Sequence, residues 1–79
     1  MDYRKQHLES SISDAQSAIQ GYLERITIYN DIIAEFSITD PTVAQIYMDW
    51  NIRWNEAIDN LQVNLIKFQS QYNREYGNE

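Results

Sequence analysis

The first half of the chain carries a regular repeat of hydrophobic residues. Its members are separated alternately by four and three residues, with isoleucine at every a position of the heptad. They are Leu8, Ile12, Ala15, Ile19, Tyr22, Ile26, Tyr29, Ile33 and Phe36. Because this spacing places all of these side chains on one stripe of an α-helix, the sequence predicts a helix over residues 3–36.

The segment that follows predicts a break in the helix. Asp40 is suited to cap the N-terminus of a second helix, and Pro41 is suited to its first position, where the missing N–H costs nothing. Proline also disfavours helical backbone at the residue before it. We therefore expect a turn at residues 37–40.

The second half continues the hydrophobic repeat. Its stripe consists of Val43, Tyr47, Trp50, Trp54, Ala57 and Leu61, followed by Leu65, Phe68, Tyr72 and Tyr76. The spacing shifts by one residue after Leu61, which is a local stutter in the heptads. Gly77 is a plausible end for the helix. This pattern predicts a second helix over residues 41–76.

Folding the chain back at the turn pairs the two stripes in one antiparallel register. Phe36 then meets Val43 beside the turn, and Leu8 meets Tyr72 at the far end. The pairs between them are Ile33–Tyr47, Tyr29–Trp50, Ile26–Trp54, Tyr22–Ala57, Ile19–Leu61, Ala15–Leu65 and Ile12–Phe68. The expected fold is all-α: a single domain over residues 1–79, formed by a two-helix hairpin with coiled-coil-like packing. Each helix should be about 50 Å long.

The chain has more apolar side chains than one seam between two helices can cover. The candidate interaction residues are Leu23, Ile28, Ile32, Ile46, Trp50, Ile52, Trp54, Val63 and Ile66. Burying such residues in a second interface predicts a homodimer of hairpins that forms a four-helix bundle. The alternative is that these are ordinary exposed aliphatic residues, which soluble proteins commonly carry.

Composition and charge restrict the partners. The chain has 79 residues and no cysteine, so disulfides cannot stabilise its small core. Its formal net charge of −6 opposes binding to nucleic acid or to an anionic membrane surface. We expect no signal peptide and no transmembrane segment, and a cytoplasmic or virion-associated location. The expected partners are a second copy of the chain and a larger protein or assembly.

The sequence offers no candidate catalytic, cofactor-binding or metal-binding residues. His7 is the one histidine, and no second metal ligand of its kind is available to it. No serine has an evident activating base, and no phosphate-binding loop is present. Trp50 and Trp54 could line a ligand pocket, but they are interpreted as core and interface anchors. The expected protein is therefore not an enzyme.

Two functions remain. The first is a small structural or assembly component, viral or from a mobile element, that acts as a homo-oligomer in protein–protein interaction. The second is an acidic inhibitor that mimics nucleic acid and occupies a basic surface of an enzyme. The acids that would form its binding surface are Asp14, Glu24, Asp31, Glu35, Asp49, Glu56 and Asp59.

Overall fold

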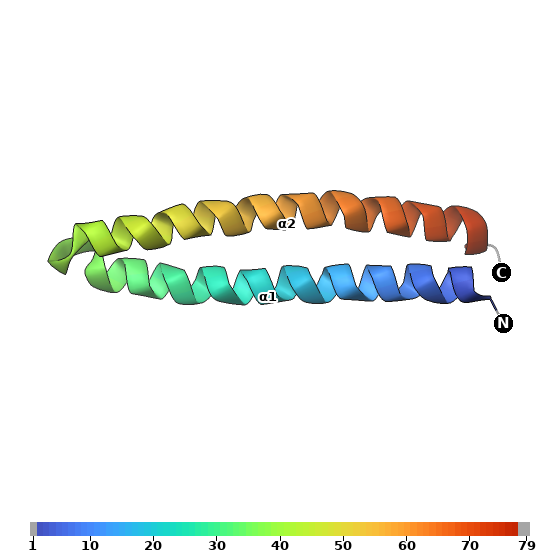
Figure 1. The fold of residues 1–79 in the computed structure, drawn as a ribbon, viewed down its shortest axis with the longest axis horizontal. Coiled ribbons are helices and arrows are strands. Elements are labelled where there is room, and N and C mark those ends of the chain that lie inside the picture. Colours follow the sequence, from blue (N-terminus) through green and yellow to red (C-terminus); the bar gives the residue numbers. More distant parts are fainter. Residues whose placement is uncertain (1, 78–79) are drawn as a thin grey trace.

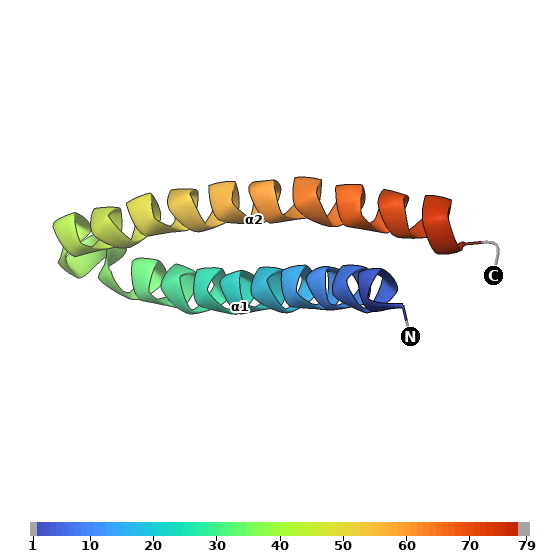
Figure 2. The ribbon, with the colours of Figure 1, turned by 45° about the vertical axis from the view of Figure 1, so that its right-hand side comes forward.

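The chain forms two long helices that lie side by side in opposite directions (Figures 1 and 2). The computed structural model describes residues 2–77, so residues 1, 78 and 79 of the predicted domain lie outside the described part. Helix α1 spans Tyr3–Thr39 and helix α2 spans Pro41–Tyr76. The hairpin measures 58 × 17 × 16 Å, and the start of α1 lies beside the end of α2 at the end opposite the turn (Figure 1). The predicted antiparallel helical hairpin is confirmed.

The reversal of direction is shorter than predicted. Helix α1 continues through residues 37–39, which were expected to form the turn, and only Asp40 between the helices is non-helical. Its backbone lies at φ −149° and ψ 81°, and its carboxylate accepts a hydrogen bond from the Val43 N–H at 3.3 Å. Pro41 occupies the first turn of α2 as predicted. Proline restricts only the residue before it, so nothing prevents α1 from continuing to Thr39.

Contacts between the helices agree with the predicted register to within about one helical turn. Near the chain ends, the Tyr72 hydroxyl donates to Glu9 at 3.1 Å. Nearer the turn, the Asn51 side-chain amide donates to Asn30 at 2.9 Å. Glu9 is adjacent in sequence to Leu8, which was predicted to meet Tyr72.

The buried stripe of α2 differs from the predicted one. The buried residues of this helix are Ala44, Asn51 and Ile58, at 2%, 8% and 6% exposure. Together with half-buried residues they form a continuous stripe spaced alternately by three and four residues. This seam consists of Ala44, Tyr47, Asn51, Trp54, Ile58, Leu61, Leu65, Phe68 and Tyr72. The predicted stutter after Leu61 is therefore wrong, because Val43, Trp50 and Ala57 flank the seam and do not form its centre.

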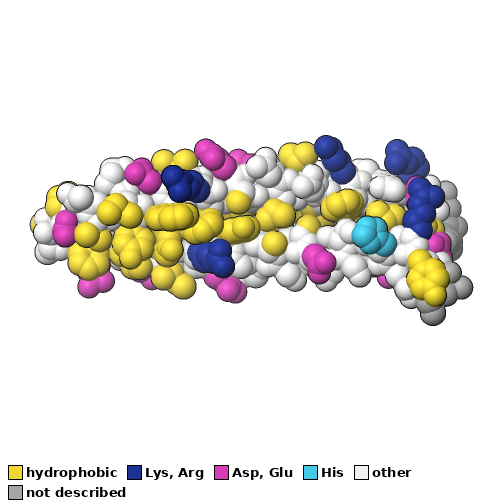
Figure 3. All heavy atoms as spheres, in the orientation of Figure 1, with side chains coloured by type: hydrophobic (Ala, Val, Ile, Leu, Met, Phe, Trp, Pro, Cys, Tyr) yellow, Lys and Arg dark blue, Asp and Glu magenta, His cyan; other side chains and the backbone are white. Residues whose placement is uncertain are grey.

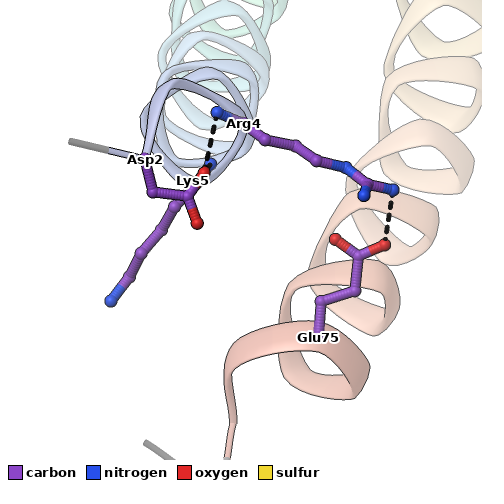
Figure 4. Close-up of polar contacts among 4 residues, drawn as sticks. All are labelled: Asp2, Arg4, Lys5 and Glu75. Atoms are coloured by element: carbon purple, nitrogen blue, oxygen red, sulfur yellow. Dashed lines mark hydrogen bonds and ion pairs between the residues drawn. The ribbon is translucent and has the colours of Figure 1, made fainter.

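Polar contacts that the sequence pattern did not predict lie at the open end of the hairpin (Figure 4). The Asp2 carboxylate caps α1 by accepting from the backbone N–H groups of Arg4 and Lys5, at 3.0 and 3.1 Å. The Arg4 guanidinium also donates to Glu75 of α2 at 2.8 Å. The hydrogen bond from the Lys5 backbone N–H favours the charged carboxylate and is the main reason that the pKa of Asp2 lies below its ordinary value.

Replacing Asp2 by asparagine is expected to make the stability of the hairpin less sensitive to acid. A carboxyl group with a lowered pKa stabilises the folded state above its unfolded pKa, and that contribution is lost as the pH falls through the folded value. Asparagine also caps helices but does not titrate in this range. Thermal unfolding followed by circular dichroism from about pH 2 to 6 measures the difference. Asp14→Asn, in the interior of α1, is the control, and parallel pH profiles for Asp2→Asn and the parent chain would refute the role of the cap.

Candidate interaction surface

The two sides of the hairpin, to either side of the seam, differ in composition. In an antiparallel helix pair the g positions of both helices flank the seam on one side and the e positions flank it on the other. The observed seam places Arg25, Ile32 and Trp50 at g, whereas Leu23 and Asn55 are at e. The contacts support this division, because the Arg25 guanidinium lies over the Trp54 ring, whereas Asn30, at an e position, bonds to Asn51.

The g side carries a mixed aromatic, aliphatic and cationic surface. We call it the aromatic face, and it consists of Arg25, Ile28, Ile32, Ile46, Trp50, Arg53 and the exposed edge of Trp54. Figure 3 shows hydrophobic side chains gathered over the half of the molecule nearer the turn, with a basic side chain on each helix beside them. Trp50 is 40% exposed and Ile46 is 52% exposed, so this surface is open to a partner.

An aromatic cluster supports this face from beneath. It is formed by Tyr22, Tyr29, Tyr47, Trp50 and Trp54. The Trp54 ring lies 5.4 Å from Tyr22 and 6.4 Å from Tyr29, and it stacks on Trp50 at 5.2 Å between ring centroids. Tyr29 meets Tyr47 edge to face at 4.9 Å. Tyr29 was predicted to meet Trp50, but its ring contacts are with Tyr47 and Trp54, because Trp50 lies outside the seam.

Two arginines lie against this cluster, one from each helix. The Arg25 guanidinium carbon is 5.4 Å from the Tyr22 ring centroid and 5.3 Å from that of Trp54. The Arg53 guanidinium carbon is 4.9 Å from the Trp50 ring centroid. These distances are within the range of cation–π attraction. Because the helices are antiparallel, the two arginines lie at the same level of the hairpin, on either side of the Trp50–Trp54 stack.

Open grooves adjoin both arginines. One, of about 300 Å³, is lined by Ile46, Asp49, Trp50 and Arg53 of α2. The other, of about 220 Å³, is lined by Ala18, Gly21, Tyr22 and Arg25 of α1. Each groove thus combines an aromatic wall with a guanidinium group, which is a combination that suits binding of a side chain from another protein.

The opposite side is largely uncharged. We call it the amide face, and it consists of Gln16, Gln20, Leu23, Asn30, Met48, Ile52, Asn55, Asp59, Gln62 and Ile66. Asp59 is the one ionisable residue of this set, and Glu9 lies at an e position on the same side, near the start of α1. Ile52 is 57% exposed and Ile66 is 62% exposed, so it also presents aliphatic side chains to solvent.

The structure distributes the nine predicted interaction residues over more than one surface. Five of them, Ile28, Ile32, Ile46, Trp50 and Trp54, lie on the aromatic face. Leu23, Ile52 and Ile66 lie on the amide face, and Val63 lies on the outer side of α2. Trp54 and Ile32 are half-buried, and the other seven are exposed.

Sequence reasoning missed Arg25 and Arg53 as parts of the surface. A signal for them was present, because Tyr22 and Arg25 are three residues apart, as are Trp50 and Arg53. Residues at this spacing are neighbours on a helix surface. The repeated pairing of an aromatic residue with an arginine indicates stacked cations on the same side of both helices.

The described residues give no evidence of a metal centre or a membrane span. Residues 2–77 contain no group of three His, Cys, Asp or Glu side chains arranged to hold a metal ion. Neither α1 nor α2, within the same residues, has a stretch apolar enough to span a lipid bilayer.

Comparison with known proteins does not assign this surface. No protein-family model, curated protein or solved structure matches the chain significantly.

Proposed function

We propose that the chain is a non-enzymatic protein–protein interaction module, a small structural or assembly component that acts as a homo-oligomer. The observation that carries this proposal is the balance between buried and exposed apolar side chains. The hydrophobic residues that are buried among residues 2–77 are Leu8, Ala15, Ala44 and Ile58. The exposed large ones are Tyr3, Leu23, Ile28, Ile38, Ile46, Met48, Trp50, Ile52, Val63 and Ile66.

The energetic gain available from association is large relative to the stability of a small domain. Full burial of one large aliphatic side chain contributes about 1.5–3 kcal/mol. The net stability of a typical domain is only about 5–15 kcal/mol. Covering even a few of the exposed residues by another protein surface would therefore change the stability of the hairpin substantially.

Self-association is best placed on the amide face. A two-fold axis brings the same patch of two copies together, so like charges on the patch would oppose each other. The amide face contains Asp59 but no lysine or arginine, and its glutamines and asparagines can donate to and accept from their counterparts. Leu23, Met48 and Ile52 supply the apolar contacts, and the product would be a four-helix bundle.

Light scattering on the full chain is expected to give a mass of at least two copies. Ile52→Glu places a charge in the proposed interface and is expected to weaken association at least tenfold, because a buried unpaired charge is strongly unfavourable. Trp50→Glu, on the aromatic face, is the matched control and should leave the mass unchanged. A single-copy mass at every concentration would refute self-association, and dissociation by Trp50→Glu alone would refute the choice of face.

The acidic inhibitor is the second candidate, and the separation of charge on the hairpin favours it. Glu24, Asp31, Asp49 and Glu56 are exposed on the sides of the helices away from the seam. Glu24 and Asp31 lie on the outer side of α1 and Asp49 and Glu56 on that of α2, so either pair would attract a basic surface over a long range. Binding to a basic enzyme that falls steeply with added salt would support this function, whereas assembly through apolar contacts should persist at high salt.

A further inference from the structure

We infer that the aromatic face binds an amphipathic helix of another protein, one whose apolar stripe is flanked on both sides by carboxylates. This inference rests on the proposed function, because it names the chemistry of the partner that the interaction module would bind. The two arginines that lie over rings, the distribution of charge and the grooves beside Trp50 and Tyr22 support it.

The arginines are prepared to bind carboxylates. Arg25 and Arg53 each lie over an aromatic ring, and the N–H groups of a guanidinium match a carboxylate with two parallel hydrogen bonds. Neither Arg25 nor Arg53 forms an ion pair with an acid among residues 2–77. Asp49 is the acid nearest to Arg53 along the groove, and its carboxylate accepts instead from the Gln45 side chain at 3.0 Å.

Basic residues are concentrated on this side of an acidic chain. All lysines and arginines except Lys5 occupy g or c positions, which are on the side of the aromatic face: Arg4, Arg25, Arg53, Lys67 and Arg74. Among the acids, Asp14 and Glu35 share these positions. Figure 3 shows the basic side chains distributed along this face. The g and c positions therefore carry five bases and two acids in a chain of net charge −6, although Arg4 is paired with Glu75 and Asp49 lines the groove beside Arg53.

The same charges argue against a second copy as the occupant. In a two-fold dimer through the aromatic face, Arg25 and Arg53 lie at one level near the centre of each patch. The cations of the two copies would therefore oppose each other, at a loss in affinity. A partner of opposite charge has no such conflict.

The grooves define where the partner would lie. The partner helix would lie with its apolar stripe along the Trp50–Trp54 stack. Its side chains on one flank would enter the groove lined by Ile46 and Trp50, and those on the other flank would enter the groove lined by Gly21 and Tyr22. Because an arginine borders each groove, the partner needs carboxylates on both flanks of its stripe. This arrangement corresponds to a helix that binds in a groove through apolar anchors.

A pair of designed peptides tests the inference on the full-length chain. Both are amphipathic helices of about 18 residues with a leucine stripe, flanked by glutamate in one peptide and by glutamine in the other. Calorimetry is expected to show at least tenfold tighter binding of the glutamate peptide at low salt. The double variant Arg25→Gln, Arg53→Gln should reduce its affinity to that of the glutamine peptide. The control Lys67→Gln, Arg74→Gln removes two charges from the same side, away from the cluster, and should retain most of the preference.

Each other outcome overturns the inference in a recognisable way. If the two peptides bind equally well and Trp50→Ala weakens the binding of both, the aromatic face binds proteins through apolar contacts alone. That result would refute the role of the arginines. Equal loss in both double variants would refute the specific pairing with Arg25 and Arg53. If neither peptide binds, the proposed helical partner is refuted. It is also refuted if the chain binds phosphatidylserine vesicles and the variant Arg25→Gln, Arg53→Gln does not. The mass measurement above judges the proposed self-association independently of all these results.

Discussion

Replacing Trp54 by alanine is expected to lower the free energy of unfolding by about 3 kcal/mol, near the lower end of the range for large aromatic residues in cores. Trp54 is the centre of the aromatic cluster, since its ring contacts Tyr22, Tyr29 and Trp50 and lies beneath Arg25. Its removal would leave rings of both helices without their shared neighbour. Urea unfolding followed by circular dichroism measures the change as a shift of the midpoint.

Trp50→Ala is the matched control for this prediction. Trp50 is 40% exposed and flanks the seam, so its truncation should reduce stability by only about 1 kcal/mol. Its main effect should be weaker binding of a partner at the aromatic face, where exposed tryptophan is a typical binding hot spot. Equal losses of stability in the two variants would contradict the assignment of a structural role to Trp54 and a binding role to Trp50.

Replacing Asn51 by leucine is expected to raise the free energy of unfolding by about 1–2 kcal/mol. Asn51 is 8% exposed in the centre of the seam, and its side-chain oxygen has no hydrogen-bond partner among residues 2–77. Apolar replacement of a buried polar group is often neutral or stabilising. Asn30, which would lose its partner, is exposed and can bond to water instead. The same urea experiment measures the gain.

The stabilised variant should keep the parent register. A buried asparagine can specify register in coiled coils, but here Asp40 alone connects the helices and already fixes their alignment. The near-ultraviolet circular dichroism of the aromatic cluster should therefore be unchanged. Asn60→Leu, at an exposed position of α2 outside the seam and the amide face, is the control and should change stability little. A loss of stability in Asn51→Leu would show that the Asn51–Asn30 hydrogen bond outweighs the gain from apolar packing.

The sequence was sufficient to predict the hairpin because α1 has an apolar residue at every seam position. In α2 the seam includes a polar residue, Asn51, and a small one, Ala44, whereas Trp50 and Val43 are more hydrophobic and stand one position earlier. The predicted stripe therefore agrees with the seam at Tyr47, Trp54 and Leu61, but at the alternate positions it takes the residue one place too early. The apparent stutter arose because the last of these early positions, Ala57, is followed by seam residues only, from Leu61 and Leu65 onward.

The candidate surface was less accessible to sequence reasoning. Hydrophobicity identified Ile46 and Ile52 as residues outside the seam, but it does not state on which side of the seam a residue lies. That assignment requires the true register of both helices. The structure separates Ile46, which lies on the aromatic face, from Ile52, which lies on the amide face. It also places the guanidinium groups of Arg25 and Arg53 over tryptophan rings of the aromatic face.

The start of α1 and the end of α2 lie together at one tip of a 58 Å rod, which has a practical consequence. A fluorophore, surface tether or fused domain attached next to Asp2 or Gly77 would project from the tip opposite Asp40. The Trp50–Trp54 stack lies in the half of the hairpin nearer Asp40, so it would stay accessible. The half of the hairpin between the attachment point and the stack would act as a rigid spacer. The hairpin can therefore be immobilised through either end, and its affinity for soluble ligands measured, without the attachment covering the stacked tryptophans.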